Sequence, residues 1–257
     1  MSDHLCSNSL LNPFKFAYKP GHSTETALFE IVNDVLFSLD NGNISSVTFR
    51  DLSAAFDTID HNILLNCLEH VFGIHSAALQ WFSYLTNRTQ TVSINNLKSD
   101  PAPVLYGVPQ GSVLRPVLFV LYTTTLSDVI ERHSIHHHSF ADDMQLRNSA
   151  PPHHVSELVQ SMQECIHDVK VWMSSNKLKL NDDKTEAMIV SSQRMSTSLP
   201  MPDSPTVGTS NAMFSQSVKT LGVMLGAHLT MKNQVINLVR TANFELRGII
   251  PFITIFL

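Results

Sequence analysis

Residues 139–146, SFADDMQL, place two adjacent carboxylates, Asp142 and Asp143, directly after an apolar Phe-Ala pair. Like charges side by side repel each other, and the repulsion grows as water is excluded. Such a pair is stable if it is solvated in a surface turn or if it holds a cation. A surface turn is the ordinary interpretation of an isolated Asp-Asp pair. A metal site requires a third carboxylate from elsewhere in the chain.

The composition is that of a folded globular protein. The 257 residues are 43% hydrophobic and 15% charged, which provides enough apolar character for a sizeable core. The formal net charge of −5 weakly opposes a nucleic-acid partner, because proteins that bind phosphates usually carry a basic face. The net charge does not show where the charged residues lie, so a local basic surface is compatible with it. Three widely spaced cysteines, Cys6, Cys67 and Cys165, indicate a reducing compartment, with neither a disulfide framework nor a zinc site.

The two ends of the chain do not predict a membrane segment. The first 15 residues lack the basic region and apolar run of a signal peptide. Residues 249–257, IIPFITIFL, are apolar, but a bilayer takes about 20 residues to cross. We expect this tail to be buried or to be the end of a truncated domain. The sequence therefore predicts an intracellular protein, in the cytoplasm and nucleus, with no membrane partner.

Hydrophobic periodicity and turn residues predict an alternation of helices and strands. An apolar stripe predicts a helix over 23–40, capped by Ser23 or Thr24, and Asp60 can cap the next helix. We also expect strands at 45–52, 89–95 and 218–225, and a hairpin at 177–192. Further helices are expected at 76–85, at 155–175 and from about 231, and a turn at 105–113 opens a long helix that ends near 131. Residues 192–212 are rich in Ser, Pro and Thr and predict a loop or hinge.

This order predicts a β-α-β-β-α-β unit, in which an antiparallel sheet is backed by helices on one face. The Asp-Asp pair should lie at the tip of the central hairpin, and the first strand can lie beside that hairpin. Asp51, near the end of the first strand, could then face Asp142 and Asp143, although 91 residues (142 − 51) separate Asp51 from Asp142. That arrangement supplies the missing third carboxylate.

Six motifs in a fixed order carry a family resemblance. They are GHSTETAL (21–28), DLSAAFDTIDH (51–61), GVPQGSVL (107–114), FADD (140–143), LKLNDDKTEAMIV (178–190) and KTLGVML (219–225). Any one of them is weak evidence, but together they resemble the reverse transcriptase of LINE-type (non-long-terminal-repeat) retrotransposons. The resemblance covers about residues 12–248.

The resemblance implies an α+β fold, the right-hand fold of polymerases, with fingers, palm and an incomplete thumb. Its expected divisions are an N-terminal fingers segment at 1–44, the palm and fingers core at 45–191, and a Ser/Pro-rich loop, primer-grip-like strands and the start of the thumb at 192–257. The implied activity is that of an RNA-directed DNA polymerase, a nucleotidyltransferase. Its implied partners are an RNA template, a DNA primer and deoxynucleoside triphosphates, with the element RNA in a ribonucleoprotein as a further candidate.

By similarity, Asp51 and Asp142 are expected to be the principal metal ligands and Asp143 the third carboxylate. Nucleotide addition by this family implies two Mg²⁺ ions about 3.5–4 Å apart, which Mn²⁺ can replace. Hard cations prefer oxygen ligands, so aspartates suit them better than the 13 histidines do. Bound cations would offset the repulsion within the Asp-Asp pair.

The resemblance also assigns residues to the incoming nucleotide. Phe56 stands at the steric-gate position, where an aromatic ring excludes a 2′-hydroxyl, although an isolated Phe is ordinarily core. Gln110 resembles the glutamine that contacts the nucleotide, and Gly111 lets the backbone come close. Lys184 resembles a lysine near the triphosphate that can protonate pyrophosphate, with a solvated hairpin lysine as the alternative. Lys19 is expected to contact the triphosphate.

The sequence also carries a dense group of histidines, His133, His136, His137, His138, His153 and His154. A zinc site is one interpretation of such a group. Loops tolerate solvated histidines, and relatives often carry histidine before the Asp-Asp strand. We therefore expect incidental surface histidines here.

Three arginines depart from the family pattern: Arg50 replaces an apolar strand residue, Arg115 a glycine and Arg147 a tyrosine. Buried charge at Arg50 would be costly. With the incomplete thumb and no endonuclease domain, these departures predict a truncated or decaying copy that extends primers weakly. Two alternatives to a polymerase therefore remain, a non-catalytic polymerase-like fold that binds nucleic acid or protein, and a relic without function.

Overall fold

The computed structural model describes the backbone of residues 2–8, 10, 12–15, 17, 21–53, 56–180, 185–196, 206–207, 210–211 and 214–253. It describes the side chains of the same residues, except those of 2–3, 51–53, 180, 206–207, 210–211 and 248–253.

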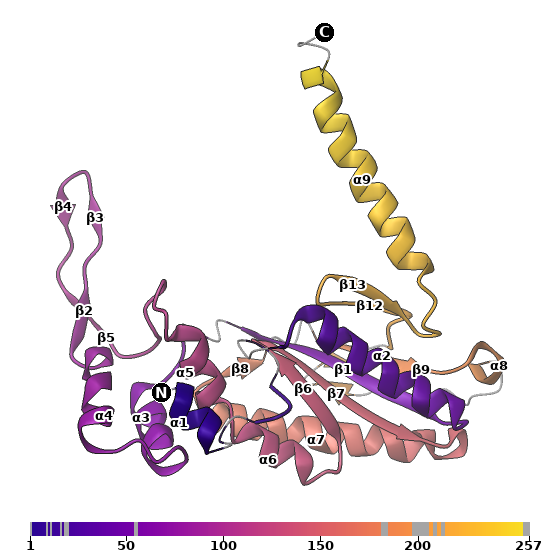
Figure 1. The fold of residues 1–257 in the computed structure, drawn as a ribbon, viewed down its shortest axis with the longest axis horizontal. Coiled ribbons are helices and arrows are strands. Elements are labelled where there is room, and N and C mark those ends of the chain that lie inside the picture. Colours follow the sequence, from indigo (N-terminus) through magenta and orange to yellow (C-terminus); the bar gives the residue numbers. More distant parts are fainter. Residues whose placement is uncertain are drawn as a thin grey trace.

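An antiparallel sheet forms the centre of the molecule (Figure 1). Its strands are β6 (His136–Phe140), β7 (Asp143–Ala150), β1 (Ile44–Ser53), β8 (Lys179–Leu180) and β9 (Glu186–Val190). β1 pairs with β7 along one side and with β8 and β9 along the other, and β6 forms the far edge beside β7. The expected placement of the first strand beside the central hairpin is confirmed.

The expected hairpin at 177–192 is wrong. β8 and β9 do not pair with each other; both run antiparallel to β1, with Leu180 opposite Leu52 and Glu186 opposite Phe49. The two strands are therefore successive parts of one path along β1. Turn-forming residues between two β-prone segments predict a hairpin locally, but here both segments find the same long partner strand.

The sheet is covered on both faces, which corrects the expectation of helices on one face. On one face, α7 (Val155–Ser175) packs Met162 and Ile166 into the same apolar core as Met144 and Leu146 of β7. On the other face, α2 (Thr24–Asp40) and the hairpin of β12 (Ser217–Thr220) and β13 (Val223–Gly226) enclose a second core. Its members include Val35, Val47, Phe49, Met188, Val218 and Leu225. Because side chains alternate along β1, Val47 and Phe49 belong to the second core, whereas Ser46 and Thr48 lie near Met162 and Ile166 of α7.

Capping residues set the starts of two helices as expected. The Ser23 side chain accepts a hydrogen bond from the Thr26 amide, and the Thr26 hydroxyl accepts one from the Ser23 amide, so α2 begins with a capping box. The Asp60 carboxylate accepts hydrogen bonds from the Asn62 and Ile63 amides at the start of α3 (His61–His70). Both starts follow from local chemistry.

The long helix expected to end near 131 is two helices, α5 (Arg115–Tyr122) and α6 (Leu126–Glu131). The break falls at consecutive threonines. The Thr123 hydroxyl donates to the Phe119 carbonyl and the Thr124 hydroxyl to the Val120 carbonyl, 3.0 and 2.9 Å away. Threonine is stiff at χ1 and competes for carbonyls of the preceding turn, so a threonine run ends the helix despite its apolar flanks. The expected strand at 218–225 is likewise the β12–β13 hairpin.

Two parts of the chain project from this body (Figure 1). At one end, α4 (Ser76–Gln80) and the 3₁₀ helix η1 (Trp81–Leu85) lead into a hairpin arm of β2 (Arg88–Gln90), β3 (Ser93–Ile94), β4 (Leu97–Lys98) and β5 (Ala102–Val104). At the other end, α9 (Lys232–Ile253) rises from β13. None of the helices in the described part of the chain has the length and apolarity needed to cross a bilayer.

The shorter elements complete the described chain. They are α1 (Ser2–Ser7), η2 (Pro152–His154), α8 (Gln193–Ser196), β10 (Thr206–Val207) and β11 (Ser210–Asn211).

Candidate active site

The adjacent carboxylates lie where β6 turns into β7. Phe140 pairs with Asp143, so Ala141 and Asp142 form the two-residue turn and Asp143 is the first residue of β7. Only Asp142 of the pair therefore sits in the turn itself. Ala141 has a φ of +57°, a conformation that costs a residue with a Cβ atom about 1 kcal/mol or more. Such local strain is common where a turn presents functional groups.

The third carboxylate comes from β1. In the β1–β7 ladder, Asp51 is the direct partner of Asp143, and Arg50 is the partner of Met144. Directly paired residues of an antiparallel ladder have Cα atoms about 4.5–5.5 Å apart and share a face of the sheet. The backbones of Asp51 and Asp143 are therefore adjacent, while the side chain of Asp51 lies outside the described part of the chain.

Within the described side chains, no group of three or more His, Cys, Asp or Glu residues is placed to hold a metal ion. The register brings the backbones of Asp51 and Asp143 side by side, next to the turn residue Asp142, and all three residues are of a type that supplies carboxylate oxygens. This donor set suits Mg²⁺ or Mn²⁺ and does not suit zinc, which prefers nitrogen and sulfur.

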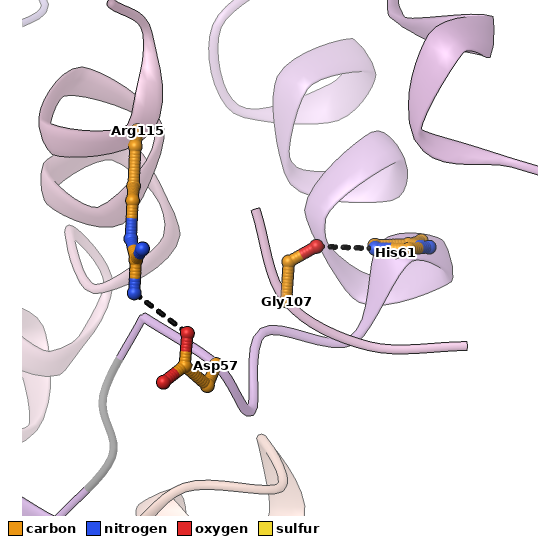
Figure 2. Close-up of polar contacts among 4 residues, drawn as sticks. All are labelled: Asp57, His61, Gly107 and Arg115. Carbon is orange, nitrogen blue, oxygen red and sulfur yellow. Dashed lines mark hydrogen bonds and ion pairs between the residues drawn. The ribbon is translucent and has the colours of Figure 1, made fainter. Parts of the chain in front are cut away.

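A second part of the site joins the end of the β1 motif to the GVPQGS turn. The Gly107 amide donates to the Ile59 carbonyl at 2.8 Å, and the Val108 amide donates to the Phe56 carbonyl at 3.2 Å. Nε2 of buried His61 donates to the Gly107 carbonyl at 2.8 Å (Figure 2). These bonds hold the turn that carries Gln110 against the segment that carries Phe56.

Glycine is required at position 107. Its φ is +84°, and a Cβ atom there would lie 2.9 Å from the Asp57 carbonyl oxygen. Gly111 has a φ of +83°, but a Cβ atom there would meet no described atom within 4 Å. Its backbone conformation therefore favours glycine, while the space beside it stays open to a ligand.

Phe56 is half-buried and contacts an aromatic ring and a cation, both from α5. Its ring centroid is 4.7 Å from that of Phe119, and the guanidinium carbon of Arg115 lies 5.0 Å from the Phe56 centroid. Arg115 also donates to an Asp57 carboxylate oxygen at 2.6 Å (Figure 2). The Arg115 side chain thus has partners, although the family pattern predicts glycine at this position.

Gln110 and Gly111 are exposed. Gln110 lines a cleft of about 580 Å³ together with Asp57, Arg88 and residues of β2, β5 and the following turn. The cleft is therefore bounded by the base of the hairpin arm and by the segment next to Phe56. Lys19 and Lys184, the two lysines expected near the triphosphate, lie outside the described residues.

A third lysine, Lys15, was not expected from the sequence. It is buried, its ammonium group donates to the Thr123 hydroxyl at 2.6 Å, and burial lowers its pKa to about 7. The neighbouring Phe14 carbonyl accepts a hydrogen bond from the Ser139 amide, so residues 14–15 lie along β6, the strand before the Asp-Asp turn. No local pattern marks Lys15, because its burial depends on a strand more than 120 residues away.

The expectation of surface histidines is wrong for two members of the group. His137 and His138 are buried in β6, and burial lowers the pKa of each to about 4. The ring of His137 lies against Phe14, with centroids 4.9 Å apart. The segment at residues 14–15 lies along this edge strand and covers His137, so a histidine that looks loop-like in the sequence is buried.

The other two departing arginines are also buried. Arg50 is 2% exposed, so the costly burial considered for it does occur. Burial raises the pKa of the Cys165 thiol on α7 to about 12, and the positive charge of Arg50 opposes that rise. Arg147 forms an ion pair with Asp34 of α2. Both arginine side chains are therefore buried against the sheet that carries the aspartates, Arg50 on one face and Arg147 on the other.

The chain resembles known proteins over most of its length. Residues 1–225 match the family described as "Reverse transcriptase (RNA-dependent DNA polymerase)". The chain is 28% identical over 191 residues to a probable RNA-directed DNA polymerase from transposon BS of Drosophila melanogaster, covering 72% of this chain and 21% of that protein. It is 25% identical over 232 residues to the RNA-directed DNA polymerase from mobile element jockey of the same species, covering 88% and 24%. The chain thus spans about a fifth to a quarter of these relatives' length.

Solved structures show the same fold. Telomerase from Candida tropicalis, in complex with the TWJ fragment of telomeric RNA, superimposes with a TM-score of 0.61 at 14% identity, over 88% of this chain and 35% of that one. Apo telomerase from the same organism gives a TM-score of 0.56 at 12% identity, over 89% and 38%. The mixed helices and antiparallel sheet are those of a polymerase palm and fingers, and the chain belongs to the reverse transcriptase family, as its resemblance to LINE-type retrotransposons predicted.

Proposed function

We propose that this chain supplies the fingers and palm of an RNA-directed DNA polymerase that adds deoxynucleotides to a primer 3′-hydroxyl. The observation that carries the proposal is the register of β1 against β7, which pairs Asp51 with Asp143 next to the turn residue Asp142. Family membership and the matching order of motifs support it.

In this proposal Asp51 and Asp142 are the principal metal ligands, and Asp143 is the third carboxylate. Bound Mg²⁺ would favour the deprotonated primer hydroxyl and offset the charge on the triphosphate and leaving pyrophosphate. The chain's own contribution would be positioning, and it is supported by the β1–β7 ladder, which pairs the backbones of Asp51 and Asp143 without any bound ion. Mn²⁺ would serve the same ligands.

The remaining roles fall on the second part of the site. Phe56 would exclude a 2′-hydroxyl, Gln110 would contact the incoming nucleotide, and Gly111 would allow the backbone to approach it. The shared cleft beside Gln110 and the open space beside Gly111 support these roles. Lys184 and Lys19 are proposed to meet the triphosphate. An RNA template and a DNA primer are the proposed partners, within a ribonucleoprotein that contains the element RNA.

We further propose that residues 1–44 belong to the fingers, 45–191 to the palm and fingers core, and 192–257 to the primer grip and thumb. The contact between the Gln145 side chain of β7 and the Thr220 hydroxyl of β12, 2.7 Å long, supports the last assignment. It anchors the β12–β13 hairpin to the strand that starts at Asp143, where a primer end would lie.

The decisive experiment is extension of a primed RNA template by the purified chain with Mg²⁺ and deoxynucleotides. We expect weak extension that is lost in Asp142→Asn and kept in Asp128→Asn, an exposed aspartate of α6. Filter binding of the same template-primer by both variants separates catalysis from binding. Binding without any metal-dependent extension would favour a non-catalytic fold, and loss of both in the unmodified chain would favour a relic.

A further inference from the structure

The Arg115 side chain makes two specific contacts, a cation–π contact with Phe56 and an ion pair with Asp57. It is the first residue of α5, where the positive end of the helix dipole disfavours a cation. Its guanidinium nevertheless lies over the ring of Phe56 and donates to Asp57 at 2.6 Å, with the Arg115 side chain 18% exposed and that of Asp57 71% exposed. The carboxylate of Asp57 offsets the unfavourable dipole and directs the guanidinium towards the ring.

The ring of Phe56 is consequently in contact with two side chains of α5. Phe119 of α5 packs against it at a centroid distance of 4.7 Å, and the Arg115 guanidinium lies 5.0 Å from the same centroid. Phe56 lies in a turn, where the Val108 amide donates to its backbone carbonyl at 3.2 Å, so no strand pairing fixes the direction of its side chain. Side-chain contacts therefore determine much of the ring's position.

We propose that Arg115 is a positioning residue that holds the ring of Phe56, through its ion pair with Asp57, and thereby sets how strictly the site rejects ribonucleotides. The inference rests on the proposed function, since it requires Phe56 to be the steric gate. A gate excludes a single hydroxyl only if its ring cannot turn or withdraw. Without the guanidinium, the ring loses one of its two contacts with α5 and gains that freedom.

The test measures kcat/KM for dGTP and for GTP on a primed RNA template, and expresses sugar selectivity as their ratio. Arg115→Gly and Arg115→Met should lower the ratio about three- to tenfold, the range expected from losing one partly desolvated cation–π contact. Arg115→Lys should lower the dGTP/GTP ratio less than Arg115→Met does, because lysine keeps a positive charge. Asp57→Asn should change the ratio in the same direction, because it releases the guanidinium.

Arg132→Met is the matched control, since Arg132 is an exposed arginine at the end of α6. Because extension by this chain is expected to be weak, the ratio is also measured by binding. The readout is the concentration of dGTP or GTP that stabilises a complex with a dideoxy-terminated primer and template. Melting temperatures of all variants show whether a change in the ratio merely reflects unfolding.

Each result decides between the two ideas. If Phe56→Val lowers the ratio and the Arg115 variants do not, the positioning role is overturned and the gate stands. If Phe56→Val leaves the ratio unchanged, or if the unmodified chain binds and uses both nucleotides equally, the gate fails and the inference fails with it. Equal losses for dGTP and GTP in the Arg115 variants would assign Arg115 to phosphate binding instead and would also overturn the proposal.

Discussion

The central sheet and the two projecting parts distribute polar and apolar side chains in opposite ways. Around the sheet, charged groups lie inside the protein, with Arg50 on one face and Arg147 on the other. On α9 and the hairpin arm, large apolar side chains lie in solvent, including Val235, Leu238, Val239, Phe244, Ile94 and Leu97. In most proteins charged side chains are exposed and large apolar side chains are buried, so both regions depart from the usual distribution.

The contrast separates two kinds of cost. A buried charge lowers the stability of the chain itself, because its desolvation must be offset by partners within the fold. An exposed apolar side chain costs the isolated fold little and instead creates a surface for association. The sheet should therefore respond to substitution through stability and chemistry, and the projecting parts through association.

The largest effect is expected at the end of the sheet. Asp142→Asn should lower primer extension at least about a hundredfold, because it removes a proposed metal ligand, and losing such a ligand costs several kcal/mol of transition-state stabilisation. In the absence of metal, the same substitution should leave the melting temperature unchanged or raise it, because one of two adjacent negative charges is gone. Extension assays and thermal melts in EDTA measure the two effects. If both primer extension and the melting temperature fall, Asp142 is a structural residue, and the substitution does not act through chemistry alone.

Lys15 should show the cost of a buried cation most clearly. Its pKa in the fold is about 7, against 10.5 when exposed, so the unfolded chain binds more protons between those values. Stability should therefore rise with pH from about 7 to 10, at up to about 1.4 kcal/mol per pH unit. Lys15→Met should remove this slope and stabilise the protein at pH 7 by several kcal/mol. Chemical denaturation at pH 7 and pH 9 measures both.

For Lys15→Met, the hydrogen bond to Thr123 is lost, so Thr123→Val in the unmodified background is the matched control. That variant should keep the pH slope, because the amine stays buried. A slope that survives in Lys15→Met would assign the pH dependence to other groups.

Arg50→Met should raise the free energy of unfolding by about 1–3 kcal/mol. Replacing a buried charge by an apolar side chain of similar length is often stabilising, even where the charge has partners. Arg132→Met, at an exposed site, should change stability by less than about 0.5 kcal/mol. Urea titrations of the three proteins make the comparison. Marked destabilisation of Arg50→Met would show that the guanidinium contributes more than its burial costs.

The smallest effect on folding is expected on α9. Phe244 is 75% exposed, so Phe244→Ser should change the free energy of unfolding by less than about 0.5 kcal/mol while lowering self-association in light scattering. Leu225→Ser on β13, where the leucine is 2% exposed, should cost several kcal/mol. If the two substitutions destabilise the chain equally, α9 is packed in solution and the contrast between the regions is lost.

The sequence alone was sufficient to predict those features that depend on residues close together in the chain. The ends of α2 and α7 follow from apolar periodicity, and Ser23 and Asp60 cap helices because a side-chain oxygen meets amides two or three residues away. The β6–β7 hairpin follows from alternation around a two-residue turn. The order of helices and strands predicted that Asp51 lies beside the Asp-Asp strand, and the register of β1 against β7 confirms that pairing of the backbones.

Tertiary structure decided the rest, because the deciding partner was remote in the chain. β8 and β9 align along β1 instead of pairing with each other, since β1 offers both of them a longer partner. His137 and Lys15 are buried where residues 14–15 lie along β6, and their pKa values fall for that reason. Arg115 gained its partners only when the fold brought α5 to Asp57 and Phe56. Local chemistry determines where elements begin and end, whereas burial and charge pairing depend on which surfaces meet.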